Sequence, residues 1–209
     1  MFPPLYAIID PALTSVAGLK LAESLAAAGV KLIQLRDKSG TPRAIYEGSR
    51  EIAALSAKSS VRFIVNDRPD IAAMCGAGGV HVGQDDLPVE AARAICRKPL
   101  WVGVSTHNLA QLRDADRTSA DYIAVGPVFP TGTKAYPDPV VGLEFIRAAR
   151  QATRKPLVAI GGITVESAAD VFRAGADSVA VIRDLIAVPD PAQRAREYLE
   201  VADKVRRAT

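Results

Sequence analysis

The segment GPVFPTGTK, residues 126–134, gathers in one short stretch the groups that suit an anionic ligand. Gly132 has no side chain, so the backbone can approach a ligand closely there. Thr131 and Thr133 add hydroxyl groups, and Lys134 adds a positive charge. Because the segment directly follows the apolar run YIAV, it predicts an anion-binding loop at the end of a strand, with phosphate as the simplest ligand.

A second polar group follows an apolar run in QLRDK, residues 34–38. Alternation along a strand places Gln34, Arg36 and Lys38 on one face. The forked guanidinium of Arg36 can bind two phosphate oxygens, and Lys38 adds a point charge. The residues alone leave an alternative open, which is a solvated strand end where Asp37 pairs with a cation.

Two carboxylates, Asp67 in VNDR and Asp86 in GQDDLP, also follow apolar runs. With the amides of Asn66 and Gln84 beside them, they resemble a site for a hard cation. Mg²⁺ takes one or two protein carboxylates and completes its shell with water and substrate phosphate. Helix capping is the alternative, because each aspartate lies shortly before a proline that can begin a helix.

Three other positions each allow a structural and a functional interpretation. His81, inside GVHVG, is more typical of an interior histidine than of a ligand. Ser105 follows the next apolar run and suits either a ligand contact or a turn. Gly162, in IGGIT, fits a phosphate cradle of backbone amides, but a structural turn explains the glycine pair equally well. No convincing general base or reactive cysteine stands out.

Composition narrows the class of protein. The chain has 209 residues, a net charge of +3 and only 5% aromatic residues, which suits an anionic small substrate and does not indicate nucleic acid. No apolar run approaches the ~20 residues that span a bilayer, and the N-terminus lacks a signal-peptide pattern, so no membrane association is expected. Cys75 and Cys96 form no CxxC pair and are expected to be separate reduced thiols. We therefore expect a cytoplasmic protein.

Short apolar runs alternate with amphipathic segments along the whole chain, which predicts strands followed by helices. The predicted strands are 5–10, 31–36, 62–65, 79–82, 100–105, 122–127, 156–162 and 178–182. The predicted helices are 15–29, 41–58, 69–76, 88–96, 108–118, 142–152, 164–175 and 190–208. Thr41 is expected to cap the second of these helices, with Pro42 at its first position.

Eight such units without a composition break predict a single α/β domain over residues 1–209, a (β/α)8 TIM barrel. A doubly wound open sheet is the alternative, although no GxGxxG follows the first strand. In a barrel the polar residues at the strand ends converge on one face. That face would hold a diphosphate beside a metal, and a monophosphate beside glycine amides and threonines.

Seven motifs in the same order resemble the thiamine phosphate synthase family, and together they run through nearly the whole chain. They are QLRDK, VNDR, HVGQDDLP, GVSTHN, GPVFPTGTK, AIGGIT and GADSVAVI. Each motif alone is weak evidence for the family, but seven motifs in the same order along the chain are specific for it. The fold of that family is the (β/α)8 barrel, which agrees with the strand count.

The resemblance implies a Mg²⁺-dependent transferase that joins hydroxymethylpyrimidine diphosphate to a thiazole monophosphate, or its carboxylate, and releases pyrophosphate. In the mechanism proposed for the family, the C–O bond to the diphosphate breaks first and the thiazole nitrogen then attacks the pyrimidine-methyl cation. The implied catalytic residues are Arg36, Lys38, Ser105 and Lys134. The implied metal ligands are Asp67 and Asp86.

The resemblance also implies two sets of substrate contacts. Those to the pyrimidine diphosphate are Gln34, Arg36, Lys38, Asn66, Ser105 and Lys134. Those to the thiazole phosphate are Thr131, Thr133, Gly162 and the backbone near Ile182 and Arg183. Further expected substrate-binding positions are Leu35, Asp37 and Gly132.

Arg183 is a departure, because many members of the family carry serine there. If the family contact is a backbone amide, the arginine is compatible with it and is expected to strengthen phosphate binding. A thiazole tautomerase and a non-catalytic phosphate sensor are the competing functions, and the complete QLRDK, Asn66–Asp67 and Asp86 set argues against both. The sequence leaves open whether the chain forms a homo-oligomer, which thiazole form it prefers and whether the loop 126–138 closes as a lid.

Overall fold

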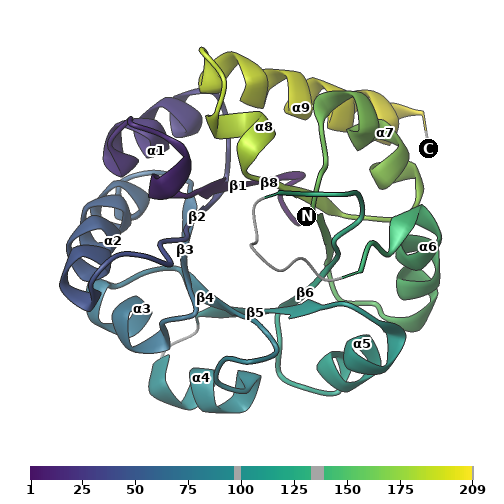
Figure 1. Ribbon diagram of the computed structural model, residues 1–209, viewed down its shortest axis with the longest axis horizontal. Coiled ribbons are helices and arrows are strands. Elements are labelled where there is room, and N and C mark those ends of the chain that lie inside the picture. Colours follow the sequence, from purple (N-terminus) through teal and green to yellow (C-terminus); the bar gives the residue numbers. More distant parts are fainter. Residues whose placement is uncertain (97–99, 133–138, 209) are drawn as a thin grey trace.

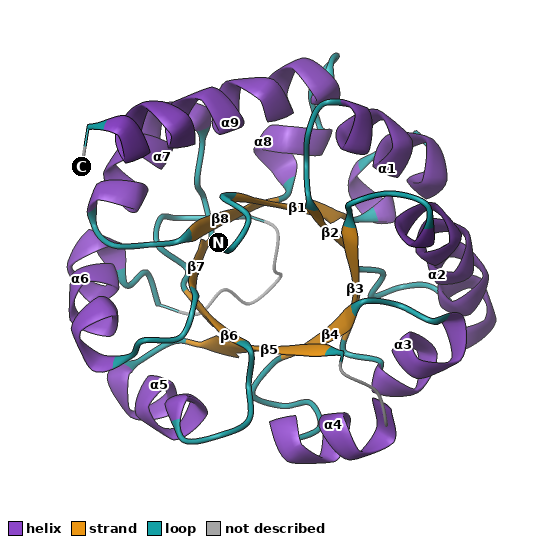
Figure 2. Cartoon of the chain, turned by 180° about the vertical axis from the view of Figure 1, so that it is seen from behind, coloured by secondary structure: helices purple, strands orange, loops and turns teal. Residues whose placement is uncertain are grey.

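The computed structural model describes residues 1–96, 100–132 and 139–208. Within these ranges, eight parallel strands form a closed barrel in chain order, and the last strand pairs with the first. Helices surround the strands as an outer ring (Figures 1 and 2). The predicted (β/α)8 barrel is confirmed, and the open doubly wound sheet is excluded by the closure.

Every predicted strand and helix is present, with small shifts at the ends. The strands are β1 (Leu5–Ile9), β2 (Leu32–Leu35), β3 (Arg62–Asn66), β4 (Gly79–Val82), β5 (Trp101–Thr106), β6 (Tyr122–Val125), β7 (Leu157–Ile160) and β8 (Ser178–Val181). The helices are η1 (Pro11–Leu13), α1 (Gly18–Ala27), α2 (Pro42–Ala57), α3 (Pro69–Cys75), α4 (Val89–Cys96), α5 (Leu109–Asp116), α6 (Gly142–Ala152), α7 (Val165–Arg173), α8 (Arg183–Ile186) and α9 (Pro191–Arg207). The short η1 and α8 were not predicted, because one turn shows no apolar periodicity.

Local signals set several of these boundaries. The Thr41 hydroxyl accepts a hydrogen bond from the Ala44 N–H at 3.2 Å, and Pro42 begins α2, as predicted. Cys75 and Cys96 both carry free thiols, and Cys96 is buried. No helix in the described ranges is long and apolar enough to cross a membrane.

Alternation along the strands divides the apolar side chains into two cores. The larger core lies between the strands and the helices, whereas the smaller one fills the barrel. The buried side chains of the smaller core are Tyr6, Ile8, Leu32, Ile64, Tyr122, Ala124, Val158 and Ala180. Because both faces of each strand are covered, the strands read as nearly continuous apolar runs.

Aromatic rings cover the N-terminal end of the barrel. Phe2 stacks on Trp101 with ring centroids 5.2 Å apart, and its ring centroid lies 5.4 Å from that of Tyr122. The Arg62 guanidinium carbon lies 4.0 Å from the centroid of the Trp101 ring, which is a cation–π contact. Both views place the N-terminus inside the ring of strands, beside β8 (Figures 1 and 2). The carboxyl ends of the strands are therefore the end at which a ligand can enter.

Candidate active site

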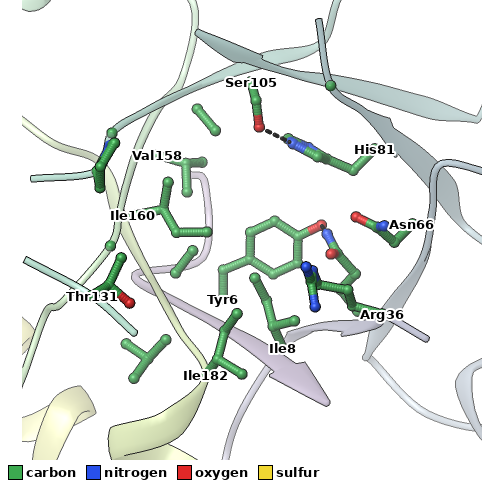
Figure 3. A pocket seen from close by; sticks show the side chains of 18 of the residues that line it. Tyr6, Ile8, Arg36, Asn66, His81, Ser105, Thr131, Val158, Ile160 and Ile182 are labelled. Carbon is green, nitrogen blue, oxygen red and sulfur yellow. Dashed lines mark hydrogen bonds between the residues drawn. The ribbon is translucent and has the colours of Figure 1, made fainter. Parts of the chain in front are cut away.

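The carboxyl ends of the strands surround a cavity of about 700 Å³. Figure 3 shows Arg36 and Asn66 on one side of the Tyr6 ring, and Val158 and Ile160 on the other. The cavity thus combines a polar wall with an apolar one. The predicted site residues that line it are Gln34, Arg36, Lys38, Asn66, Asp67, Asp86, Ser105, Thr131, Gly132, Gly162, Ile182 and Arg183. Two others, Thr133 and Lys134, lie outside the described residues.

The side chains of Leu35 and Asp37 do not belong to the cavity wall. Leu35 is buried in the outer core, between the strands and the helices. The Asp37 carboxylate accepts hydrogen bonds from the Gly40 N–H at 2.7 Å and the Ser39 N–H at 3.1 Å, and so shapes the loop before α2. Period-two alternation turns these two side chains away from Gln34 and Arg36, so substrate binding by Leu35 and Asp37 stays a prediction that concerns their backbone atoms.

Arg36 is held by a residue that the sequence interpretation missed. Its Nη1 forms an ion pair with Oδ2 of Asp10, which is only 4% exposed. The other Asp10 oxygen accepts a hydrogen bond from the Ala12 N–H at 3.0 Å. Asp10 is thus fixed at the end of β1 and orients the guanidinium. Its place directly after an apolar strand is the signal that could have identified it.

Asp67 is the centre of the acidic part of the site. Its backbone φ of 60° lies in the left-handed region, which is costly for a residue with a side chain and is most common at functional sites. The carboxylate forms an ion pair with Lys38. The alternative that Asp67 caps α3 is wrong, because Arg68 occupies the N-cap position and no side chain caps that helix.

Asp86 lies close enough to Asp67 to raise its pKa. Burial is the largest cause that raises the pKa of Asp67, and the hydrogen bond with the Asp86 carboxyl adds to it, against the opposing effect of Lys38. Asp86 also accepts a hydrogen bond from the Gly83 N–H at 2.7 Å, which fixes its side chain. A buried carboxylate with a raised pKa, next to a second carboxylate, forms a place that a cation would stabilise.

The carboxylates of Asp67 and Asp86 suit Mg²⁺ better than a metal whose ligands all come from the protein. No group of three or more His, Cys, Asp or Glu side chains with metal-binding geometry occurs in the described part of the chain. Two carboxylates would leave most coordination positions to water and ligand oxygens, as Mg²⁺ prefers. Structural zinc sites, in contrast, use four protein ligands.

A chain of hydrogen bonds crosses the floor of the cavity. Gln34 Nε2 donates to the Tyr6 hydroxyl at 2.6 Å, and the Tyr6 and Tyr122 hydroxyl oxygens lie 2.9 Å apart. The Tyr122 hydroxyl lies 3.1 Å from His81 Nδ1. His81 Nε2 lies 2.8 Å from Ser105 Oγ (Figure 3). The prediction of an interior, hydrogen-bonded His81 is confirmed, and its partner is the predicted Ser105.

The Ser105–His81 contact does not make a nucleophile and base pair. Burial lowers the pKa of His81 to about 4, so its imidazole is a weak base at neutral pH. Its second nitrogen meets the Tyr122 hydroxyl rather than a carboxylate. The site therefore lacks the orienting acid of a Ser–His–Asp triad, and Ser105 is suited to bind rather than to attack.

The glycine pair after β7 serves the structure and the cavity together. Gly161 and Gly162 have φ values of 101° and 63°. A Cβ at Gly162 would lie 2.4 Å from the Pro130 carbonyl oxygen, so a larger residue would displace the loop after β6. The Val128 N–H donates to the Ile160 carbonyl at 2.9 Å and keeps that loop in place. The turn and cradle interpretations are therefore compatible, because the turn holds Gly162 on the cavity wall.

The chain is similar to known proteins over nearly its whole length. The family described as thiamine monophosphate synthase matches residues 5–185. The thiamine-phosphate synthase of Koribacter versatilis is 48% identical over 206 residues, covering 95% of this chain and 95% of that protein. That of Methanospirillum hungatei is 43% identical over 198 residues, covering 94% and 96%. The solved structure of thiamine phosphate pyrophosphorylase from Pyrococcus furiosus superposes with a TM-score of 0.88 at 33% identity, covering 97% of this chain and 96% of that one.

Proposed function

The chain belongs to the thiamine monophosphate synthase family, and on this premise we propose how its residues make thiamine phosphate. It is a transferase that joins 4-amino-2-methyl-5-hydroxymethylpyrimidine diphosphate to the thiazole phosphate and releases pyrophosphate. The observation that carries the proposal is one cavity with a cationic and acidic part on one wall and a glycine-rich part on another. The two relatives described above are named as synthases and the solved structure as a pyrophosphorylase, and none of the three is named as a tautomerase or a sensor.

The reaction needs a stabilised leaving group more than it needs a base. The C–O bond to the diphosphate breaks, its electron pair leaves with pyrophosphate, and the electron-rich pyrimidine delocalises the positive charge. The lone pair of the thiazole nitrogen then forms the new C–N bond. Arg36 and Lys38 supply fixed positive charge to the leaving group. Mg²⁺, held by Asp67 and Asp86, would supply further charge to the phosphate oxygens.

The second substrate is assigned to the opposite part of the cavity. Thr131, Gly162 and the backbone at Ile182 and Arg183 would bind the thiazole phosphate, because they line the cavity on the side of the loops after β6, β7 and β8. Ser105, Gln34 and Asn66 are left for the pyrimidine. Two small-molecule substrates and a cytoplasmic location complete the proposal, and the composition of the chain supports both.

Three residues of the loop after β6 enter the proposal through their motif. Thr133 is assigned to the thiazole phosphate and Lys134 to the leaving diphosphate, on the resemblance of GPVFPTGTK to the family. Gly132, which precedes them in the chain, lines the cavity beside Thr131. Leu35 and Asp37 take no side-chain part, for the reason given above.

The test of the function is pyrophosphate release from both substrates, with and without Mg²⁺. We expect release that matches thiamine phosphate formation one for one, and that stops when EDTA removes the metal. Release without coupling would indicate hydrolysis instead. Binding of both substrates without turnover would indicate a sensor. Full turnover in EDTA would leave the synthase function in place and refute the metal assignment alone.

Replacing Arg183 with serine is expected to raise the KM for the thiazole phosphate by about 10- to 100-fold, because a lost charge-assisted hydrogen bond is worth about 1.5–3 kcal/mol. Arg183 lines the cavity at the start of α8. The neighbouring Asp184 carboxylate accepts a hydrogen bond from the Tyr198 hydroxyl at 2.7 Å, so it is engaged elsewhere. Steady-state kinetics with Arg183→Lys as the matched variant would check this, and a lower KM in Arg183→Ser would contradict it.

A further inference from the structure

The hydrogen-bonded chain on the cavity floor joins five strands through side chains far apart in sequence. Its members are Gln34, Tyr6, Tyr122, His81 and Ser105, on β2, β1, β6, β4 and β5. A sixth residue makes room for it. A Cβ at Gly103 would lie 2.0 Å from Cζ of Tyr122, so the absence of a side chain there admits the tyrosine ring into the barrel.

Each tyrosine hydroxyl of this chain, and the neutral His81 ring, has one proton to give, which sets the direction of donation. Gln34 Nε2 can only donate, so the Tyr6 oxygen accepts from it. The Tyr6 proton then goes to Tyr122, and the Tyr122 proton goes to His81 Nδ1. That leaves the single ring proton of neutral His81 on Nε2, which donates to Ser105 Oγ.

Burial keeps the members in the protonation states that this count requires. It raises the pKa of both Tyr6 and Tyr122, so both phenols keep their protons. It lowers the pKa of His81, so the ring carries one proton at neutral pH. In the reverse direction, Tyr122 would donate to Tyr6. The Tyr6 proton would then lack an acceptor in the described structure, because both of its partners, Gln34 Nε2 and Tyr122, would be donors. An unsatisfied buried donor of this kind destabilises the folded protein.

We propose that this one-way chain holds His81 as the Nε2–H tautomer and thereby presents Ser105 to the substrate as a hydrogen-bond donor. Tyr6 and Tyr122 are then positioning residues, since they act on the substrate through His81 and Ser105. The part that concerns the substrate rests on the proposed function, whereas the tautomer of His81 does not. The two parts can therefore fail separately.

The direction of the chain has a consequence for specificity. The direction of donation leaves the Ser105 proton free for a substrate atom that offers a lone pair, because the Ser105 oxygen already accepts from His81. A ring nitrogen of an aminopyrimidine offers a lone pair, whereas the protonated nitrogen of a pyrimidinone does not. We expect a lower kcat/KM for a substrate that leaves this proton without an acceptor.

The tautomer can be measured directly, because the chain has only two histidines. His107 Nδ1 lies 2.6 Å from the Gly126 carbonyl oxygen, which can only accept, so His107 carries a proton on Nδ1. Long-range ¹H–¹⁵N correlation spectra of the free protein at neutral pH, assigned with His107→Gln, should show His81 with its proton on Nε2. A proton on Nδ1 of His81, or a doubly protonated ring, would overturn the proposal.

A pair of matched variants tests the positioning role. Tyr122→Phe keeps the ring but removes the donor to His81 Nδ1, so we expect loss of the pure Nε2–H tautomer. We also expect about a tenfold lower kcat/KM for the pyrimidine diphosphate, with an unchanged KM for the thiazole phosphate. Tyr6→Phe removes the adjacent hydroxyl but leaves the Tyr122 donation intact, so the tautomer should persist.

The outcomes separate the inference from the proposed function. A Tyr122→Phe variant with the wild-type tautomer and wild-type kcat/KM would overturn the inference. A wild-type protein with the expected tautomer but no thiamine phosphate synthesis would support the chain and refute the function. The spectrum of the unaltered protein decides the tautomer even if Tyr122→Phe fails to fold.

Discussion

Replacing Asp67 with asparagine is expected to lower the rate of thiamine phosphate formation by about 10²–10³-fold, the range seen when one group that stabilises a transition-state charge is removed. The Mg²⁺ concentration for half-maximal rate should rise as well. Asparagine has nearly the same shape and tolerates the left-handed backbone that Asp67 adopts at φ 60°. The variant therefore removes a negative charge and little else.

The stability of Asp67→Asn separates a metal role from a structural one. Burial raises the pKa of Asp67, which means that the ionised carboxylate is unfavourable in the folded protein at neutral pH. The ion pair lost with Lys38 is more than half exposed on the lysine side and contributes little. We therefore expect an unchanged or higher melting temperature together with the loss of activity.

The control for Asp67→Asn is Asp70→Asn, three residues along the chain. Asp70 pairs with Arg68 at 2.6 Å on an exposed part of α3, outside the cavity. Initial rates across a Mg²⁺ series for the wild type and both variants give the comparison. An Asp67→Asn variant with wild-type rates at low Mg²⁺ would contradict the assignment of Asp67 as a ligand.

Replacing Arg36 with alanine is expected to lower kcat/KM for the pyrimidine diphosphate by about 10²–10³-fold, because a forked, charge-assisted contact to the leaving group is lost. Asp10→Asn should lower the same kcat/KM by about tenfold, because the Arg36 guanidinium would keep its charge but lose its orientation. The two effects share one cause. In a double-mutant cycle, Asp10→Asn should therefore have almost no further effect in an Arg36→Ala background.

Thermal unfolding tests the Arg36–Asp10 ion pair independently of activity. Arg36→Ala leaves Asp10 buried without its cation, and breaking a buried pair from one side costs about 3–5 kcal/mol. The double variant should recover much of that stability. Arg43→Ala is the matched control, because Arg43 pairs with Glu47 on the exposed face of α2. Additive losses of kcat/KM in the cycle would refute the positioning role of Asp10.

The fold could be predicted because its signals are local. Apolar runs, prolines and glycines mark each strand and helix within a few residues of chain, and a barrel follows from repeating the unit. The motifs also placed the polar residues at the correct strand ends. The side chains of Leu35 and Asp37 do not share the surface of Gln34 and Arg36, because strand alternation assigns neighbouring residues of QLRDK to opposite faces.

The supporting residues of the site could not be predicted in the same way. Tyr6 and Tyr122 are 116 positions apart, and only closure of the barrel makes their hydroxyls neighbours. Asp10 and Arg36 are 26 positions apart on adjacent strand ends. No local pattern encodes such pairs, because the register of distant strands decides them. The residues that touch a ligand carry motifs, whereas those that hold them in place do not.

Within the described ranges, the cover formed by Phe2, Trp101 and Arg62 closes the N-terminal end of the barrel. Under the proposed function, two substrates and two products would then pass through the same opening at the carboxyl ends of the strands. If the pyrimidine rests on the floor of Tyr6 and His81, as the proposed function implies, it would have to arrive before a thiazole bound nearer the rim. We therefore expect the closed end of the barrel to impose an order of substrate addition, although it lies far from the atoms that react.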